Sequence, residues 1–204
     1  MENVLLGNLA LSSKAQIGRF WFKNRSLSPI PLFLLLVLMP AKIEWSVAGY
    51  TILIGLLIWS ESIRIWAVGY AGSSTRTRGD RVNDFVHAGP YRYVRNPLYI
   101  ANILLYTFTG LLFGNALMAA IIFVYSSVQY TFIVAYEEEI LVSTFRTQYE
   151  EFHRRVPRWI PSFSPKIHST PHVFSLRQSL KSEKSTFYSI TLMAILFFVK
   201  RMIA

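Results

Sequence analysis

Long apolar stretches, separated by short polar segments, are the dominant pattern of this chain. They cover residues 30–39, 46–70, 98–113, 116–135 and 187–203. A helix that crosses a bilayer needs about 20 predominantly apolar residues, and all but the first stretch approach or reach that length. The pattern therefore predicts an all-α, polytopic membrane bundle with four to five transmembrane helices and a helical extension into the cytoplasm.

The segments between these stretches predict how the helices are connected. Gly114-Asn115 is a tight turn signal, so the stretches on either side of it are expected to form a helical hairpin. The stretch 30–39 is flanked by prolines and is short for a span. It either crosses the membrane together with its flanking residues or forms a re-entrant piece. The last stretch, 187–203, either spans the membrane or lies in its interface.

A second apolar periodicity follows the fourth stretch. The residues that recur at spacings of four and three are Leu141, Phe145, Tyr149, Phe152 and Val156. This spacing is typical of one face of an amphipathic helix. We expect that helix to continue the fourth span out of the membrane until Pro157 ends it, which places Glu137 and Glu138 where the helix leaves the bilayer.

The chain is expected to have one domain with two flanking parts. The membrane domain covers residues 29–161. A cytoplasmic segment precedes it at residues 1–28, and a flexible linker with the C-terminal apolar stretch follows it at 162–204. Residues 162–185 are rich in Ser, Pro, His and Lys, which is typical of a flexible linker and not of a packed element.

Basic residues predict the orientation of the bundle. They lie before the first apolar stretch, in the loop 72–97 and after the fourth stretch, and they are Lys14, Arg19, Lys23, Arg25, Arg76, Arg78, Arg81, Arg92, Arg95, Arg146, Arg154, Arg155 and Arg158. The opposite loops carry only Lys42 and Glu44. Positive residues favour the cytoplasmic side, so these three basic segments are expected to face the cytoplasm. If the last stretch spans, Lys200 and Arg201 lie on the outer side.

Composition narrows the chemistry. The chain is 52% hydrophobic with a net charge of +10 and a mean hydropathy of +0.35, so its basic residues indicate a membrane surface and not nucleic acid. There is no cysteine, which excludes disulfides, thiolate ligands and cysteine nucleophiles. The four histidines do not have the spacing of a metal site, and no metal is expected.

The first candidate site is the polar run Gly89-Pro90-Tyr91-Arg92-Tyr93-Val94-Arg95-Asn96-Pro97-Leu98-Tyr99. Gly-Pro makes a turn that brings the backbone close to a ligand, and the tyrosines offer flat faces for an adenine or a cation. The arginines can clamp a carboxylate or phosphate. Asn96 suits the N-cap and Pro97 the first turn of the next helix. The structural alternative is a positive anchor with a helix cap.

The second candidate site is the acidic pair. Glu137 and Glu138 can accept hydrogen bonds from a cationic ligand or from ribose hydroxyls; the alternative is a charged, solubilising helix end. A third pair, Glu61 and Arg64, lies on one helix face within an apolar stretch. Ionisable residues in such a place face the bundle interior or mark function, unless they already lie at the cytoplasmic end of the span.

Together these residues resemble a known family. The run from Gly89 to Tyr99, the pair Glu137-Glu138 with its amphipathic face, and Val156-Pro157-Arg158 with Ile160-Pro161 are similar to the integral-membrane methyltransferases. That group includes the isoprenylcysteine carboxyl methyltransferases and the phospholipid N-methyltransferases, and the resemblance covers residues 47–161. It implies a membrane enzyme that uses S-adenosylmethionine and takes a lipid-like or small apolar acceptor from the bilayer.

The resemblance also implies roles for individual residues. The implied cofactor-binding residues are Gly89, Tyr91, Arg92, Arg95, Asn96, Pro97, Tyr99, Glu137 and Glu138. Arg155 matches an arginine that the carboxyl methyltransferases place near the reacting carboxylate. Glu138 is the second candidate catalytic residue, because an amine acceptor must lose a proton and a glutamate or tyrosine can take it.

Two positions depart from the family pattern. The carboxyl methyltransferases usually have Arg-His-Pro where this chain has Arg95-Asn96-Pro97, and Asn-Pro-x-Tyr is closer to the phospholipid methyltransferases. The usual Phe-Gly is Phe145-Arg146 here, a change expected to alter only a helix surface, since glycine is rarely optimal inside a helix. Two alternatives stay open: a sterol-type membrane reductase that uses NADPH, and a membrane relative without activity.

Overall fold

The computed structural model describes residues 11–72, 86–164, 167 and 173–203. Within these residues the secondary structure is entirely helical. The elements are α1 (Ser13–Asn24), α2 (Ile30–Leu38), α3 (Val47–Ala71), the 3₁₀ helix η3 (Gly89–Arg92), α4 (Pro97–Leu112), α5 (Ala116–Arg155), α6 (Leu176–Ser182) and α7 (Lys184–Ile203). The expected all-α membrane bundle is therefore confirmed.

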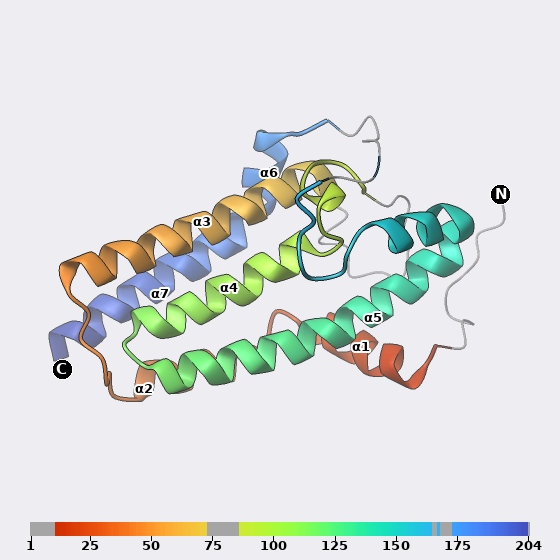
Figure 1. Cartoon of the computed structure of the whole chain (residues 1–204). Helices are drawn as coiled ribbons and strands as arrows, with labels where there is room; N and C mark the ends of the chain where they lie inside the picture. Colours follow the sequence, from red (N-terminus) through yellow and green to blue (C-terminus); the bar gives the residue numbers. More distant parts are fainter. Residues whose placement is uncertain (1–10, 73–85, 165–166, 168–172, 204) are drawn as a thin grey trace.

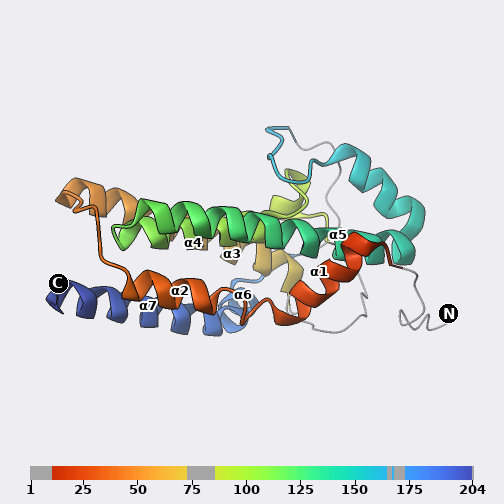
Figure 2. The same cartoon turned by 90° about the horizontal axis from the view of Figure 1, so that it is seen from below.

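The long helices lie side by side along one axis (Figure 1). Seen after a quarter turn, α3, α4 and α5 form one layer, and α2 and α7 form a second (Figure 2). The segments η3 and 156–164 gather at one end of the bundle, which we call the site end, and the α2–α3 and α4–α5 connections lie at the other, the distal end. The N-terminal helix α1 lies against α5 near the site end.

The predicted hairpin is confirmed, and its turn explains the local sequence. Gly114 has φ of 72°, and a Cβ added there would lie 2.4 Å from the Ile43 carbonyl oxygen. Glycine is therefore suited both to the positive φ and to the close approach of Ile43. The Asn115 side chain then accepts a hydrogen bond from the Met118 amide at 3.0 Å. This bond caps α5 at its first turn and sets where the fifth helix begins.

Three described helices are long and apolar enough to cross a membrane by length and composition: α3, α5 and α7. The helix α4 is apolar but shorter, with 16 residues, and α2 has 9. The first apolar stretch is thus shorter than a span on its own, as its length predicted.

The C-terminal helix α7 runs from the site end to the distal end, in the opposite direction to α3 (Figure 1). At the site end, Arg64 of α3 pairs with Glu183 at 2.6 Å, just before α7 begins. At the distal end, Lys200 donates hydrogen bonds to the carbonyl oxygens of Leu36, at 2.9 Å, and Met39. Those carbonyls end α2, where a cation is favourable. The two basic residues near the C-terminus thus have partners at the distal end, because Arg201 lies 3.6 Å from Glu44.

The segment expected to be an unpacked linker contains a helix. In α6, the Ser179 side chain is buried and donates a hydrogen bond to the Ile65 carbonyl oxygen at 2.7 Å. A Cβ on Gly69 would lie 2.2 Å from the Phe174 ring. The absence of a side chain at Gly69 therefore lets the segment before α6 pack directly against α3. The expectation that residues 162–185 contain no packed element is wrong, because small residues on α3 create a surface that polar composition alone did not reveal. Arg76, Arg78 and Arg81 lie outside the described residues.

The helix α5 carries a kink within the predicted amphipathic segment. Arg146 has φ of 44° and ψ of −121°, a conformation that glycine adopts readily and other residues rarely do. Beyond it, Tyr149, Phe152 and Val156 form a buried cluster that also contacts Leu141 and Phe145, so the predicted apolar face is confirmed. Arg146 stands where the family pattern usually has glycine, and it is the residue at which α5 kinks. The prediction that this replacement alters only a helix surface is therefore wrong.

Candidate functional site

The two halves of the motif lie against each other at the site end. The Arg95 amide donates to the Pro157 carbonyl oxygen at 2.9 Å, and the Ser162 amide donates to that of Tyr93 at 2.8 Å. The Arg92 side chain donates to the Ile167 carbonyl oxygen at 3.2 Å. Backbone hydrogen bonds across more than 60 residues therefore join the loop before α4 to the segment after α5.

Three consecutive glutamates on α5 point toward three different neighbours. Glu137 accepts a hydrogen bond from the Tyr99 hydroxyl of α4 at 2.7 Å. Glu138 faces the arginines of the joined loops. Glu139 accepts hydrogen bonds from the backbone and side chain of Ser12, just before α1. Successive residues of a helix are about 100° apart, so one acidic run contacts three separate parts of the fold.

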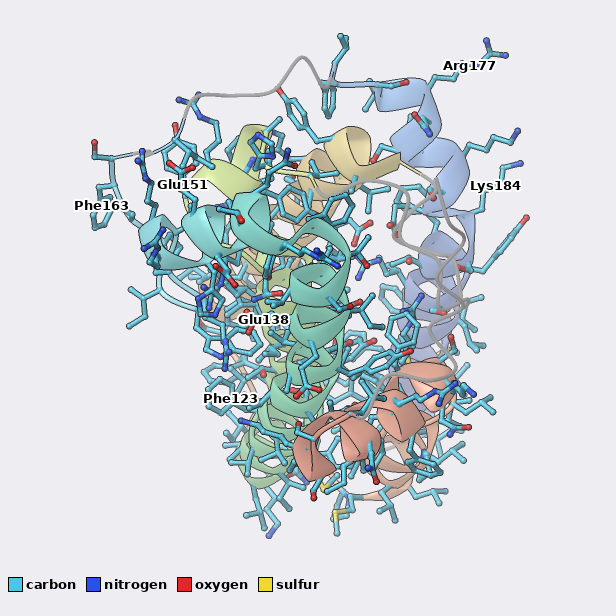
Figure 3. The ribbon with its side chains drawn as sticks, turned by 90° about the vertical axis from the view of Figure 1, so that its right-hand side faces the viewer. Phe123, Glu138, Glu151, Phe163, Arg177 and Lys184 are labelled. Carbon is cyan, nitrogen blue, oxygen red and sulfur yellow. The ribbon has the colours of Figure 1, made fainter. Side chains whose placement is uncertain are left out.

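Figure 3 locates Glu138 on α5, and this buried carboxylate is the centre of a charge cluster. It is 7% exposed. Arg95 lies 3.1 Å from its Oε1, and Arg158 meets both carboxylate oxygens, with Nε 3.2 Å from Oε1 and Nη2 on Oε2. His153 lies 3.8 Å from Oε2. Burial lowers the pKa of Arg95, and the Glu138 carboxylate opposes that shift. A two-point guanidinium contact of this kind is strong and directional.

The Tyr99–Glu137 pair lies within an aromatic wall. The ring of Tyr99 stacks on that of Tyr130 with centroids 4.7 Å apart, and the Tyr130 hydroxyl accepts from Asn102 at 3.0 Å. Tyr99 is 8% exposed. The family-implied position Tyr99 therefore contacts the family-implied position Glu137, which brings the two halves of the predicted set together.

The start of η3 places Tyr91 near the same carboxylates. Gly89 has φ of 55°, and a Cβ there would lie 2.3 Å from the Tyr70 ring, so only glycine fits this turn without displacement. Desolvation raises the pKa of the Tyr91 hydroxyl, and the charge of Glu137 adds to the shift. Both effects favour the neutral form of the Tyr91 hydroxyl.

Asn96 and Pro97 lie at the start of α4 as expected, but the side-chain amide of Asn96 has a different role from the one predicted. Pro97 lies in the first turn of the helix, and Asn96 is the residue before it, with no side-chain capping bond. Instead the Asn96 side chain donates to the Arg158 carbonyl oxygen at 3.2 Å. The predicted side-chain cap is therefore wrong: the amide holds the loop that carries Arg158, because that loop returns within its reach.

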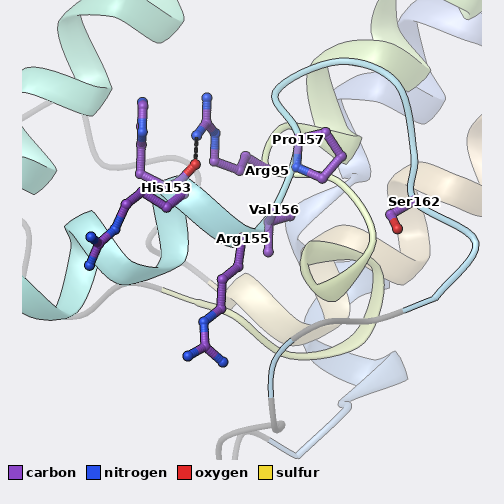
Figure 4. A pocket seen from close by; sticks show the side chains of 7 residues that line it. Arg95, His153, Arg155, Val156, Pro157 and Ser162 are labelled. Atoms are coloured by element: carbon purple, nitrogen blue, oxygen red, sulfur yellow. Dashed lines mark hydrogen bonds between the residues drawn. The ribbon is translucent and has the colours of Figure 1, made fainter.

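Arg155 is not part of the charge cluster. It pairs with Glu151 one turn away at 2.7 Å, and its side chain is half exposed. Figure 4 shows its guanidinium directed away from Arg95, which donates to the His153 carbonyl oxygen at 2.6 Å. Both arginines line a cavity of about 430 Å³ at the surface. Glu138 is met by Arg95 and by Arg158. Arg158 was not among the predicted site residues, although it stands in the run Val156-Pro157-Arg158 that carries the family resemblance.

The pair Glu61–Arg64 belongs to a different place. The side chains are 3.1 Å apart, and Arg64 also contacts Glu183 at 2.6 Å and Thr186 at 3.0 Å. These contacts join α3 to the start of α7 and involve none of the residues implied for the cofactor. Among the described residues, no group of three or more His, Cys, Asp and Glu side chains is arranged to hold a metal ion.

The central part of the chain matches known proteins. The sequence model of a family described as phospholipid methyltransferase matches residues 45–148, about half of the chain. This region begins just before α3, includes η3, α4 and the three glutamates, and ends before Arg158. No solved structure matches the chain.

Two curated proteins are similar to this chain over half of its length. The cobalt-zinc-cadmium resistance protein CzcN of Cupriavidus metallidurans is 28% identical over 101 residues, covering 50% of this chain and 44% of that protein. The nickel-cobalt-cadmium resistance protein NccN of Alcaligenes xylosoxydans xylosoxydans is 26% identical over 101 residues, with the same two coverages. The chain thus spans less than half the length of the curated relatives it matches.

Proposed function

The chain belongs to the phospholipid methyltransferase family, and from that premise we propose that it is an S-adenosylmethionine-dependent methyltransferase of the membrane. The methyl acceptor is a lipid-like or small apolar molecule of the isoprenylcysteine carboxylate or phospholipid amine class. The observation that carries the proposal is the buried Glu138 between Arg95 and Arg158, one residue from the Tyr99–Glu137 pair. The names of the relatives concern resistance and state no reaction, so the reaction rests on the family and the site.

The side chains at the site end fit the chemical groups of this cofactor. Buried carboxylates suit an ammonium or ribose hydroxyls, and arginines suit a carboxylate. The faces of Tyr91 and Tyr99 suit an adenine or a sulfonium. The residues proposed to hold the cofactor are Gly89, Tyr91, Arg92, Arg95, Asn96, Pro97, Tyr99, Glu137 and Glu138. S-adenosylmethionine would supply a methyl group bound to a sulfonium sulfur, and that sulfur leaves as a neutral thioether.

For methyl transfer the protein must then align the acceptor with the methyl group and, where the acceptor is an amine, remove its proton. No protein nucleophile is needed, because holding the acceptor in line and excluding water supply most of the required effect. For an amine acceptor, a carboxylate of the acidic run takes the proton, and Glu138 is the proposed base. For a carboxylate acceptor no proton moves, and an arginine positions the acceptor. Arg158 contacts Glu138, whereas Arg155, the residue that the resemblance implied, pairs with Glu151.

The site is proposed to face the cytoplasm. The described helices make the chain an integral membrane protein, and the site end carries Arg92, Arg95, Arg154, Arg155 and Arg158. Basic residues at one end of a bundle favour the cytoplasmic side. In this arrangement the polar cofactor reaches Glu138 from water while an apolar acceptor arrives from the bilayer.

Calorimetric titration of S-adenosylmethionine into detergent-purified protein tests the proposal. We expect binding that Glu138→Ala abolishes, since the truncation removes the carboxylate that is proposed to accept from the cofactor and leaves Arg95 and Arg158 without their shared partner. Arg155→Ala is the matched control and should bind as the parent does, because Arg155 pairs outside the cluster. NADPH serves as the comparison ligand. Folded protein that binds NADPH but not S-adenosylmethionine would support the reductase, and binding of neither would support the relative without activity.

A further inference from the structure

A second cavity at the site end brings the N-terminal helix into the site. Its volume is about 460 Å³, within the range of roughly 300–1,000 Å³ for small-molecule pockets. Leu11 and Lys14 line it on one side, and Glu138, Glu139, His153 and Arg158 line it on the other. The helix α1 lies outside residues 45–148, so the family match assigns it no role.

The contacts of α1 fix the position of Lys14 relative to the glutamates. A Cβ on Gly18 would lie 2.0 Å from the Phe132 carbonyl oxygen, so α1 approaches the α5 backbone as closely as glycine allows. One turn earlier, Ala15 is fully buried. At the start of the helix, the Ser12 amide donates to Glu139 at 3.1 Å. The backbone that carries Lys14 is therefore held against α5 at both ends of this segment.

The charges around this cavity match a zwitterion. Glu138 and Glu139 provide acceptors, and Lys14, Arg158 and His153 provide donors. Arg158 is already engaged with both oxygens of Glu138, whereas Lys14 forms no ion pair with another described residue and is exposed. An amino-acid group, with an ammonium and a carboxylate on one carbon, has the complementary pair of charges. A carboxylate has about four lone-pair sites, so Glu138 can accept a further ammonium beside its arginines.

We propose that α1 completes the cofactor site and that Lys14 binds the α-carboxylate of S-adenosylmethionine, with Glu138 accepting from its α-ammonium. This inference rests on the proposed function and extends it to one end of the cofactor. The adenosine end is then left to the tyrosines of η3 and α4. Lys14 is a binding residue in this scheme and takes no part in the transfer step.

Comparing two ligands tests the amino-acid end of the cofactor separately from its adenosine end. S-adenosylmethionine carries the amino-acid group, and 5′-methylthioadenosine lacks both of its charges. In detergent-purified full-length protein, Lys14→Gln should weaken S-adenosylmethionine binding about tenfold or more, the effect of one charged hydrogen bond. The affinity for 5′-methylthioadenosine should stay unchanged. Lys14→Arg should recover most of the lost affinity, and Lys23→Gln, on the same helix and also exposed, should have no effect.

The outcomes distinguish this inference from the proposed function. If the parent protein binds both ligands and Lys14→Gln changes neither affinity, or weakens both equally, the assignment of Lys14 is overturned while the methyltransferase proposal stands. If the folded parent binds neither ligand, the proposed function fails, and the inference fails with it. A loss confined to S-adenosylmethionine that Lys14→Arg recovers supports both.

Discussion

Replacing Arg146 with glycine should stabilise the protein. Arg146 has φ of 44° and ψ of −121° in the middle of α5, and it is the only described non-glycine residue with a positive φ. A side chain at such a backbone position clashes with its own peptide groups, whereas glycine has no Cβ and adopts it freely. The Arg146 side chain is exposed, so its removal uncovers little buried surface.

The size of the effect follows from two opposing terms. A non-glycine residue in a sparsely populated backbone region costs about 1–3 kcal/mol, and glycine recovers that cost. Glycine also loses more conformational freedom on folding, which costs roughly 0.5–1 kcal/mol relative to alanine. The expected net gain is about 1 kcal/mol, which corresponds to a rise in melting temperature of about 2–4 °C for a chain of this size.

Thermal unfolding in detergent, followed by tryptophan fluorescence, measures this gain. Arg146→Ala is the matched control, since it removes the same charge but keeps a Cβ at the strained position. We expect Arg146→Gly to melt at a higher temperature than the parent and Arg146→Ala not to. If the two variants shift the melting temperature equally, the effect belongs to the charge, and the reasoning from the backbone is refuted.

Two further predictions concern the contacts that hold the bundle together. Tyr99→Phe keeps the aromatic ring but leaves the Glu137 carboxylate without its donor, so it should lower the free energy of unfolding by about 1–3 kcal/mol; chemical denaturation in detergent measures it, and an unchanged value would contradict the hydrogen bond. Glu183→Gln removes a buried charged partner of Arg64, which keeps Glu61 at 3.1 Å, so the cost should lie below the roughly 3–5 kcal/mol of an uncompensated buried charge. It should raise hydrogen exchange in the amides of α7, while Arg201→Gln, at an exposed pair, should not.

Local patterns along the chain predicted the long apolar helices and their order. The hairpin at Gly114 and the amphipathic end of α5 were predictable because turn residues and apolar periodicity act over a few positions. The motif from Gly89 to Tyr99 and the acidic pair were predictable as candidates, since family resemblance is carried by the residues themselves. Their roles in binding and catalysis stay predictions, as does the division into three parts at 28 and 161.

Tertiary structure decided which side chains meet. The family resemblance implied a role for Arg155, but the segment that follows α5 brings Arg158 to Glu138. Asn96 holds that returning loop instead of capping its own helix. Arg146 was expected on a helix surface, and the kink places it at a backbone position that suits glycine. The contacts of Arg158 and Asn96 join residues far apart along the chain, so no spacing of neighbouring residues encodes them.

The acidic run shows the same division most clearly. Three adjacent glutamates at the end of a span are visible in the sequence, and helical geometry alone predicts that they diverge. Which partner each one finds, Tyr99, the arginines or Ser12 before α1, depends on how α4, the loop after α5 and α1 pack around it. The sequence by itself determined the chemistry available at this end of the bundle, and the packing of distant segments decided how that chemistry is arranged.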